Sequence, residues 1–308
     1  MIVIKYKKIF LAVSGLLVVL SLFLVLFVGL NIGIDFRGGS ILEVRYQDDS
    51  PSLEELRVAV ASAESIESFS LRDSDEGRFI LRTDFISDDQ KKEILSAMTF
   101  GDNFEPLEER FSAVGPLIGD ELKQKAWVAI AVAIVAIILF IAFAFRKVSV
   151  GLPIQGGVSS WKYGFAATIA LAHDIIIPLG IFSLLGLFMG AEVDVLFVMA
   201  LLAILGFSVN DTIVVFDRIR ENLRLNQENN LKEDFSLTAG KSLNQTYVRS
   251  INTSLTTLLV LLALFFLGGE VTKNFTLVLI AGVIVGTYSS IFLASPLLIL
   301  MGNLKKGG

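Results

Sequence analysis

Apolar residues run through this chain in six long blocks, and stretches with polar and charged residues separate each block from the next. A helix that crosses a bilayer needs about 20 mostly apolar residues, within a range of about 17 to 25. The first block is longer than the apolar core of a signal peptide and has no small-residue cleavage site, so we interpret it as an uncleaved anchor. The pattern predicts six membrane-spanning helices, near Ile9–Leu30, Ala126–Phe145, Gly164–Met189, Val195–Phe216, Ile251–Leu267 and Phe275–Met301.

The residues between the first two blocks follow a different pattern, with short alternating stretches and two amphipathic ones. Alternation of apolar and polar residues predicts half-buried strands, and apolar residues three or four apart predict helices. Ser52 and Ser87 each begin a capping-box sequence, which marks the start of a helix. We therefore predict one helix after each of these serines, a turn at 73–77, and strands at Gly39–Tyr46, Ser65–Leu71, Arg78–Thr83 and Glu108–Pro116.

This order of elements, βαββαβ, is that of the ferredoxin-like fold. The expected fold class is a membrane all-α six-helix bundle with an inserted α+β (ferredoxin-like βαββαβ) extracytoplasmic domain. The expected domains are residues 1–30, with the first transmembrane helix, 31–125, the extracytoplasmic domain, and 126–308, a five-helix transmembrane domain with cytoplasmic loops and tail.

Composition indicates the class of protein, and the distribution of charge predicts how the chain is oriented in the membrane. Hydrophobic residues make up 54% of the 308 residues, and a mean hydropathy of +0.70 excludes an ordinary soluble globule. Lys and Arg gather before the first block, in the loops after the second and fourth blocks, and in the tail, whereas the short loops on the other side carry only Lys273. Basic residues favour the cytoplasmic side, so we expect both termini there and residues 31–125 outside, in a multi-pass protein of the bacterial inner membrane.

The outer region also limits the possible partners and chemistry. Residues 31–125 contain 21 acidic and 11 basic residues, which argues against nucleic acid as a partner and is typical of a solvated surface. The chain has no Cys and a single His, His173, so disulfides, thiol catalysis and a His-rich metal site are excluded. We expect no metal and no cofactor.

Four ionisable residues within or at the edge of the apolar blocks are the candidate functional residues. Insertion of a charged residue near the bilayer centre costs about 2.5–3.5 kcal/mol, so such residues are functional candidates by default. His173 and Asp174 lie in the third block at a depth of ~15 Å, and Asp211 lies in the fourth at ~9 Å, counting ~1.5 Å of rise per helical residue. Arg249 stands where the fifth block begins.

Polar residues around these positions predict a polar seam between helices. Ser208 and Asn210 accompany Asp211, and the fifth block carries a polar stripe formed by Asn252, Thr253 and Thr256. The sixth block has small residues every fourth position, which let helices approach closely, at Gly282, Gly286, Ser290 and Ala294.

The residues alone leave the role of this seam open. Asp211 and Arg249 could form a static salt bridge that pins two helices, and His173 could be a packing residue. Alternatively, a helix shift that makes or breaks the Asp211–Arg249 pair would switch Asp211 between holding and releasing a proton. A proton that crosses the membrane field is worth about 2.3 kcal/mol per 100 mV, which could drive rearrangement of the bundle.

Four motifs are spread along nearly the whole chain. They are Gly33-Ile-Asp35-Phe36-Arg37-Gly38-Gly39, Trp161-Lys-Tyr-Gly164 leading to His173-Asp174, Ser208-Val-Asn-Asp-Thr-Ile-Val-Val-Phe-Asp-Arg-Ile-Arg-Glu-Asn222, and Gln245-Thr-x-x-Arg-Ser-Ile-Asn-Thr-Ser-Leu-Thr256. In order, spacing and topology, these motifs resemble those of the SecF family of the resistance-nodulation-division (RND) superfamily.

The resemblance implies a non-enzymatic accessory subunit of protein export that assembles with SecD and uses the proton gradient to help exported polypeptides emerge. It implies further contacts with the SecYEG channel and its small accessory YajC, while SecA acts at earlier steps. By matching motifs, Asp211 would be the proton-pathway carboxylate, with Arg249 as its partner and with Asp174 and His173 nearby. The linker 148–160 is longer than we expect for the family.

Three alternative hypotheses compete with a role in protein export. Asp174 and Asp211 could suggest an intramembrane aspartyl protease, whose paired carboxylates share a proton, but the Gly-x-Gly-Asp context of that class is absent before Asp211. Half of an RND-type small-molecule exporter is a second alternative, although such exporters have much larger outer portions. A membrane scaffold without proton coupling is the third.

Overall fold

A computed structural model describes residues 2–46, 50–63, 66, 68–74, 77–100, 105–145, 160–231 and 233–303. The chain divides into two compact units, one formed by residues 1–31 and 129–308 and the other by residues 32–128. Most of the linker 148–160 lies outside the described residues, so the structure does not bear on its length.

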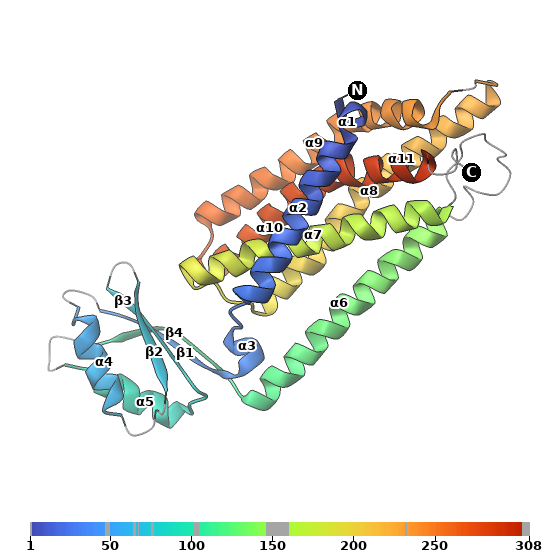
Figure 1. The fold of residues 1–308 in the computed structure, drawn as a ribbon. Helices are drawn as coiled ribbons and strands as arrows, with labels where there is room; N and C mark the ends of the chain where they lie inside the picture. Colours follow the sequence, from blue (N-terminus) through green and yellow to red (C-terminus); the bar gives the residue numbers. More distant parts are fainter. Residues whose placement is uncertain are drawn as a thin grey trace. The chain divides into compact units, whose positions relative to one another are not determined.

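The first unit is helical, and its long helices are those that the apolar blocks predict (Figure 1). Within the described ranges, six helices are long and apolar enough to cross a membrane, which confirms the six-span prediction. The helices of this unit are α1 (Ile2–Lys5), α2 (Lys7–Phe27), α6 (Pro116–Ala144), which begins in the other unit, α7 (Ser160–Met189), α8 (Val195–Glu228), α9 (Phe235–Leu267), α10 (Glu270–Ser289), the π-helix η1 (Ser290–Ala294) and α11 (Ser295–Asn303).

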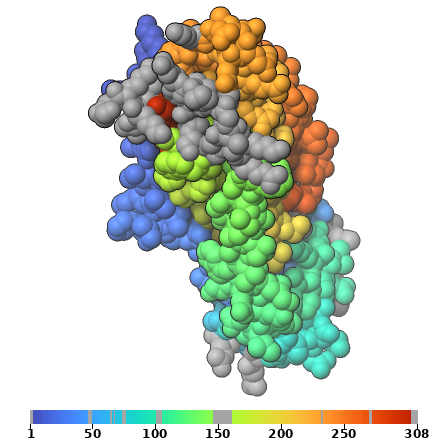
Figure 2. Space-filling model, turned by 90° about the vertical axis from the view of Figure 1, so that its right-hand side faces the viewer, coloured from blue at the N-terminus to red at the C-terminus, as the bar shows by residue number. Residues whose placement is uncertain are grey.

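Helices α8 and α9 extend well beyond their apolar blocks, and α6 begins at Pro116, ten residues before its block. Helix α8 continues to Glu228, and α9 already begins at Phe235, where the carboxylate of Asp234 caps it by accepting from the amide of Ser236. The side-chain amide of Asn222 donates to Ser242 Oγ at 2.8 Å and joins the two extensions, which lie side by side in the orange part of Figure 2. Hydrophobicity locates only the part of a helix that lies in lipid, so the block boundaries could not show these polar turns.

The core of the helical unit contains an aromatic cluster and a close helix crossing. Phe145 stacks on Tyr163 with ring centroids 5.3 Å apart, and both contact Phe216 edge-on. Helix α10 approaches α8 through its glycines, because a Cβ on Gly282 would collide with the side chain of Ile204. The small-residue ridge of the last span therefore does let two helices pack closely, as the sequence predicts.

The second unit is a four-stranded antiparallel sheet in the order β2-β3-β1-β4, with two helices (Figure 1). Both capping boxes form, at Ser52 and at Ser87. The core includes Leu42, Leu56 and Ile94, all almost fully buried. This arrangement confirms the ferredoxin-like α+β prediction. The elements are α3 (Ile34–Arg37), β1 (Gly39–Arg45), α4 (Leu53–Ala61), β2 (Phe69–Ser74), β3 (Arg78–Thr83), α5 (Asp88–Ala97) and β4 (Leu107–Val114).

The predicted position of the second strand was wrong. We expected Ser65–Leu71, but the strand runs from Phe69 to Ser74. Ser74 pairs with Arg78, so the hairpin closes across very few residues, and Gly77 turns the chain with a positive φ of 71°. Asp73 and Ser74, which we assigned to a turn, therefore continue the ladder with β3, because a tight turn needs fewer residues than a polar run suggests.

Candidate functional site

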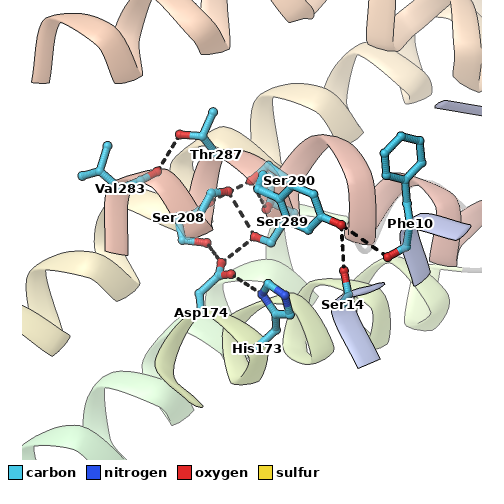
Figure 3. A network of polar contacts seen from close by, with 12 residues as sticks. Phe10, Ser14, His173, Asp174, Ser208, Val283, Thr287, Ser289 and Ser290 are labelled. Atoms are coloured by element: carbon cyan, nitrogen blue, oxygen red, sulfur yellow. Dashed lines mark hydrogen bonds and ion pairs between the residues drawn. The ribbon is translucent and has the colours of Figure 1, made fainter. Parts of the chain in front are cut away.

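The carboxylate of Asp174 is the centre of a buried polar cluster inside the helical unit (Figure 3). His173 Nδ1 lies 2.8 Å from Asp174 Oδ1, and the hydroxyls of Ser208 and Ser289 both donate to Asp174 Oδ2, that of Ser289 at 2.6 Å. Asp174 is fully buried. Helices α7, α8 and α10 thus each contribute a side chain that contacts this one carboxylate.

The cluster continues from Ser289 into the π-helix. Ser290, the first residue of η1, shares a hydrogen bond of 2.9 Å with Thr212 on α8. The side-chain hydroxyl of Ser295, just after this π turn, donates to the carbonyl of Ser290 at 3.3 Å. Single π turns inside α-helices occur frequently at functional sites, so this irregular turn supports a functional role for the cluster.

On its other side, His173 leads to the first membrane helix. The ring of His173 stacks on Tyr288 with centroids 6.2 Å apart. The Tyr288 hydroxyl donates to the carbonyl of Phe10 at 3.3 Å and accepts from Ser14 Oγ at 3.4 Å. Among the residues that the structure describes, His173 Nε2 has no hydrogen-bond partner although it is buried. The cluster therefore connects four helices and ends in an imidazole nitrogen that is available to a proton.

The chemistry of the cluster allows Asp174 to be charged or neutral. An ionised carboxylate can accept hydrogen bonds from both hydroxyls and from a ring N–H of His173. If the carboxyl gains a proton, it must donate one bond, and a serine hydroxyl can rotate to accept it because hydroxyls both donate and accept. The site can thus hold or release a proton without losing all of its hydrogen bonds.

Asp211 lies one helical turn after Ser208 on α8 and is 4% exposed. In the described part of the chain, its Oδ2 is buried and has no hydrogen-bond partner. Arg249 is close enough to act on Asp211 electrostatically, but the described residues contain no ion pair between them, and Arg249 is exposed. The structure therefore places Asp211 in the field of Arg249 without a contact, and it shows no hydrogen bond between Asp174 and Asp211 of the kind that a protease dyad would share.

The remaining seam residues lie on the surface of this chain. Of the five predicted, only Ser208 belongs to the buried cluster, whereas Asn210, Asn252, Thr253 and Thr256 are exposed. Thr253 donates to the carbonyl of Arg249 at 2.9 Å, and Thr256 donates to the carbonyl of Thr253 at 2.8 Å, both within their own helix. We call Arg249, Asn252, Thr253 and Thr256 the polar face of α9.

The motif Gly33–Gly39 belongs to the second unit, which we call the outer unit after the position expected from the sequence, and turns the chain from α3 into β1. Gly33 precedes α3, which contains Asp35, Phe36 and Arg37. Gly38 and Gly39 have positive φ angles of 77° and 128°. A Cβ on Gly38 would lie 2.8 Å from the Cα of Pro116, so only glycine fits this turn. The motif therefore has a structural explanation.

Sequence reasoning missed several members of the cluster. Ser289, Thr212 and Tyr288 were not among the candidates, and Ser290 was noted only as a small residue. The signal that could have identified them is the run Thr287-Tyr-Ser-Ser290, four consecutive hydroxyl residues inside an apolar span. Such a run lies in lipid only where other helices satisfy its hydroxyls.

Comparison with known proteins places this fold and site in a family. Residues 94–304 match the family described as "Protein export membrane protein SecD/SecF, C-terminal", and residues 23–49 match the "SecD/SecF GG Motif". A relative from Thermobaculum terrenum named "Protein translocase subunit SecF" is 39% identical, covering 98% of this chain and 94% of that protein. One of the same name from Anaerolinea thermophila is 36% identical, covering 96% and 92%.

Solved structures that resemble this chain belong to the same family. The crystal structure of SecDF, a translocon-associated membrane protein from Thermus thermophilus, matches with a TM-score of 0.80 and 33% identity, covering 97% of this chain and 38% of that one. A SecDF structure in a super-membrane-facing form has a TM-score of 0.68 and 33% identity, covering 98% and 39%. This chain spans about two fifths of those SecDF chains. With its two family matches, its near full-length relatives and its shared fold, the chain belongs to the SecF family of protein translocase subunits.

Proposed function

We propose that this chain acts with a SecD-type partner in Sec protein export and uses the proton gradient to promote late steps of translocation across the cytoplasmic membrane. Its relatives are named translocase subunits, and the solved structures that it resembles are of SecDF, in which the SecF-like part covers only a portion of the chain. A SecD-type chain is therefore the first partner to expect.

Asp211 is the observation that carries this proposal. Its buried Oδ2 has no partner among the described residues. An unsatisfied buried polar atom costs about 1–3 kcal/mol, and a carboxylate near the bilayer centre costs about 2.5–3.5 kcal/mol. Intramembrane carboxylates of this kind mark ion and proton pathways. An atom without a fixed partner is also free to exchange a proton.

The charges of Asp211 and Arg249 would couple proton binding to the packing of α8 against α9. Ionised Asp211 attracts Arg249, and protonation removes that attraction, so the preferred distance between α8 and α9 changes with each proton bound. Ser208 lies one turn from Asp211 and bonds Asp174, so Asp174 and His173 would form the next part of the same pathway. A proton that crosses the field is worth about 2.3 kcal/mol per 100 mV, enough to repack one interhelical contact.

The partner would cover the polar face of α9 together with Asn210 on α8. These side chains are exposed on this chain alone, and polar groups inside a bilayer normally face protein or water rather than lipid. Docking of the SecD-type chain there would also place its residues beside Asp211. Further partners would be the SecYEG channel, YajC, the exported polypeptide and, indirectly, SecA.

The proposed setting follows from charge and composition. Both termini would be cytoplasmic, with residues 31–125 outside, in the bacterial inner membrane. Protons rather than a bound cofactor would be the coupling ion, and the subunit would have no enzymatic activity of its own.

Export into vesicles that contain this chain, a SecD-type partner and the SecYEG channel tests the proposal. Asp211→Asn and Arg249→Ala should abolish the gradient-dependent part of export while leaving partner co-purification and gradient-free, SecA-driven export unchanged. Arg224→Ala, which removes an exposed charge from the extension of α8 outside the polar face of α9, serves as the matched control. Wild-type export by both variants under a full gradient would sink the proton-coupling proposal and favour a scaffold.

A further inference from the structure

An apolar groove runs between α9 and the last span. The groove has a volume of about 280 Å³. Ile251, Leu255 and Leu258 of α9 form one wall, and Ile284 and Phe292 of the last span form the other. Leu255 and Ile284 are 52% and 53% exposed, so the groove opens to the surroundings of the protein rather than to its core.

The hydroxyls near the floor of the groove all have partners. Ser254 and Thr287 share a hydrogen bond of 2.5 Å that joins α9 to α10, and Thr287 also donates to the carbonyl of Val283. The Tyr288 hydroxyl is bonded to Phe10 on α2. A ligand in the groove would therefore meet hydrocarbon and satisfied hydroxyls, which suits an alkyl chain and not a polar substrate.

The groove and the polar face of α9 lie on opposite sides of that helix. Ile251, Leu255 and Leu258 share one face because they are spaced by four and three residues. Arg249 and Thr256 are displaced from that face by about half a turn. The face that suits a protein partner is thus not the face that forms the groove, so the groove is directed toward lipid.

Basic residues lie at one end of the groove. Phe10 on α2 stacks on Phe292 with centroids 4.6 Å apart, and Lys7 lies one helical turn before Phe10 on the same face. Helix α1, which ends at Lys5, packs against α9, the helix that forms the other wall. Neither Lys5 nor Lys7 has an acidic partner among the residues with described positions.

We propose that this groove binds one anionic phospholipid from the leaflet at the N-terminal end of α2. An acyl chain would lie between α9 and α10, and the phosphate would bind Lys5 and Lys7. Basic residues at the membrane surface attract anionic lipids. This charge complementarity selects an anionic headgroup over a zwitterionic one.

Native mass spectrometry of the chain purified with its SecD-type partner tests the site. The complex is equilibrated with equal amounts of phosphatidylglycerol and phosphatidylcholine, and retained lipids are counted as detergent is stripped. The wild type should retain phosphatidylglycerol in at least several-fold preference. Leu255→Trp, which fills the groove from an exposed position, should abolish retention. The matched control Val132→Trp, at an exposed site on α6, should not.

The headgroup is tested by charge substitutions. Lys5→Gln with Lys7→Gln should remove the preference for phosphatidylglycerol, and Lys5→Arg with Lys7→Arg should keep it. Lys8→Gln is the control, because Lys8 lies two residues before Phe10 and so on another side of α2. Equal retention of both lipids by the wild type, or full retention by Leu255→Trp, would overturn the proposal. So would a wild-type complex that retains neither lipid, because the partner chain would then cover the groove.

Discussion

The hydroxyl of Ser289 donates to Asp174 Oδ2 at 2.6 Å, although the two residues lie 115 positions apart in the chain. Ser208 donates to the same oxygen from a different helix. One carboxylate oxygen thus fixes the position of α10 and α8 relative to α7.

Loss of the Ser289 hydroxyl should therefore weaken the helical unit. Ser289→Ala leaves Asp174 with one hydrogen bond fewer in a site without exposure, and we expect a loss of about 1–3 kcal/mol in the free energy of unfolding. Thermal unfolding in detergent would measure it. Thr253→Ala, which removes an exposed hydroxyl bonded only within α9, should leave the stability within about 0.5 kcal/mol of the wild type.

Gly282 should tolerate no side chain while Ile204 faces it. Gly282→Ala places a methyl group against Ile204, and overpacking of this kind costs about 1–3 kcal/mol. Ile204→Ala in the same chain should restore part of the loss by making room. Gly206→Ala is the control, because nothing lies within 4 Å of the Cβ it would add. If Gly282→Ala unfolds at the wild-type temperature, α10 does not pack against α8 as described.

The turn at Gly38 should also not tolerate a side chain. Gly38→Ala meets both an unfavourable φ of 77° and the backbone of Pro116, so it should lower expression of the folded protein and its resistance to protease. Gly115→Ala, with open space around its Cβ, should behave like the wild type. Limited proteolysis of the two variants side by side would decide the matter.

Leu56 and Val58 offer a matched pair on α4. Leu56 is fully buried, whereas Val58 is 63% exposed. Leu56→Ala should destabilise the outer unit by about 2–5 kcal/mol, because it removes buried methyl groups and leaves a cavity. Val58→Ala should change stability by no more than about 0.5 kcal/mol. Hydrogen exchange of the sheet amides reports on this unit separately from the membrane helices, and equal protection in both variants would contradict the described core.

Acid should remove the contribution of ionised Glu55 to the stability of the fold. Hydrogen bonds from the side chain and the backbone of Ser52 hold the pKa of Glu55 below its ordinary value of 4.5. A carboxylate whose pKa is lower in the folded than in the unfolded chain stabilises the fold above the unfolded value, and this stabilisation disappears as the pH falls through the folded value. The stability difference between wild type and Glu55→Gln should therefore be present at pH 7 and vanish well below pH 4.5. Glu54→Gln, outside the capping box, controls for the loss of charge.

Much of the fold could be predicted from local patterns. The capping boxes at Ser52 and Ser87 and the apolar blocks each depend on residues close together in the chain, so the sequence shows them directly. The strand Phe69–Ser74 was misplaced because its limits depend on pairing with β3, which is a tertiary property.

The candidate site could be predicted only in part. Asp174, His173 and Asp211 were identified because each interrupts an apolar span. Ser289 could not be paired with Asp174, because no local pattern reports which helices become neighbours. Arg249 was proposed as the partner of Asp211, and the structure places it on an exposed face within electrostatic reach of Asp211, which no local pattern could show.

The close approach of Gly38 to Pro116 bears on how the outer unit is joined to the rest of the chain. A Cβ on Gly119 would also lie 2.9 Å from the amide nitrogen of Gly38, so the two connections of the sheet domain run side by side. A domain whose two ends lie close together can be removed or exchanged without moving the flanking backbone segments. Residues 39–115 could therefore be replaced by a short flexible linker, and a chain of this kind could acquire or lose outer domains while its membrane helices stay the same.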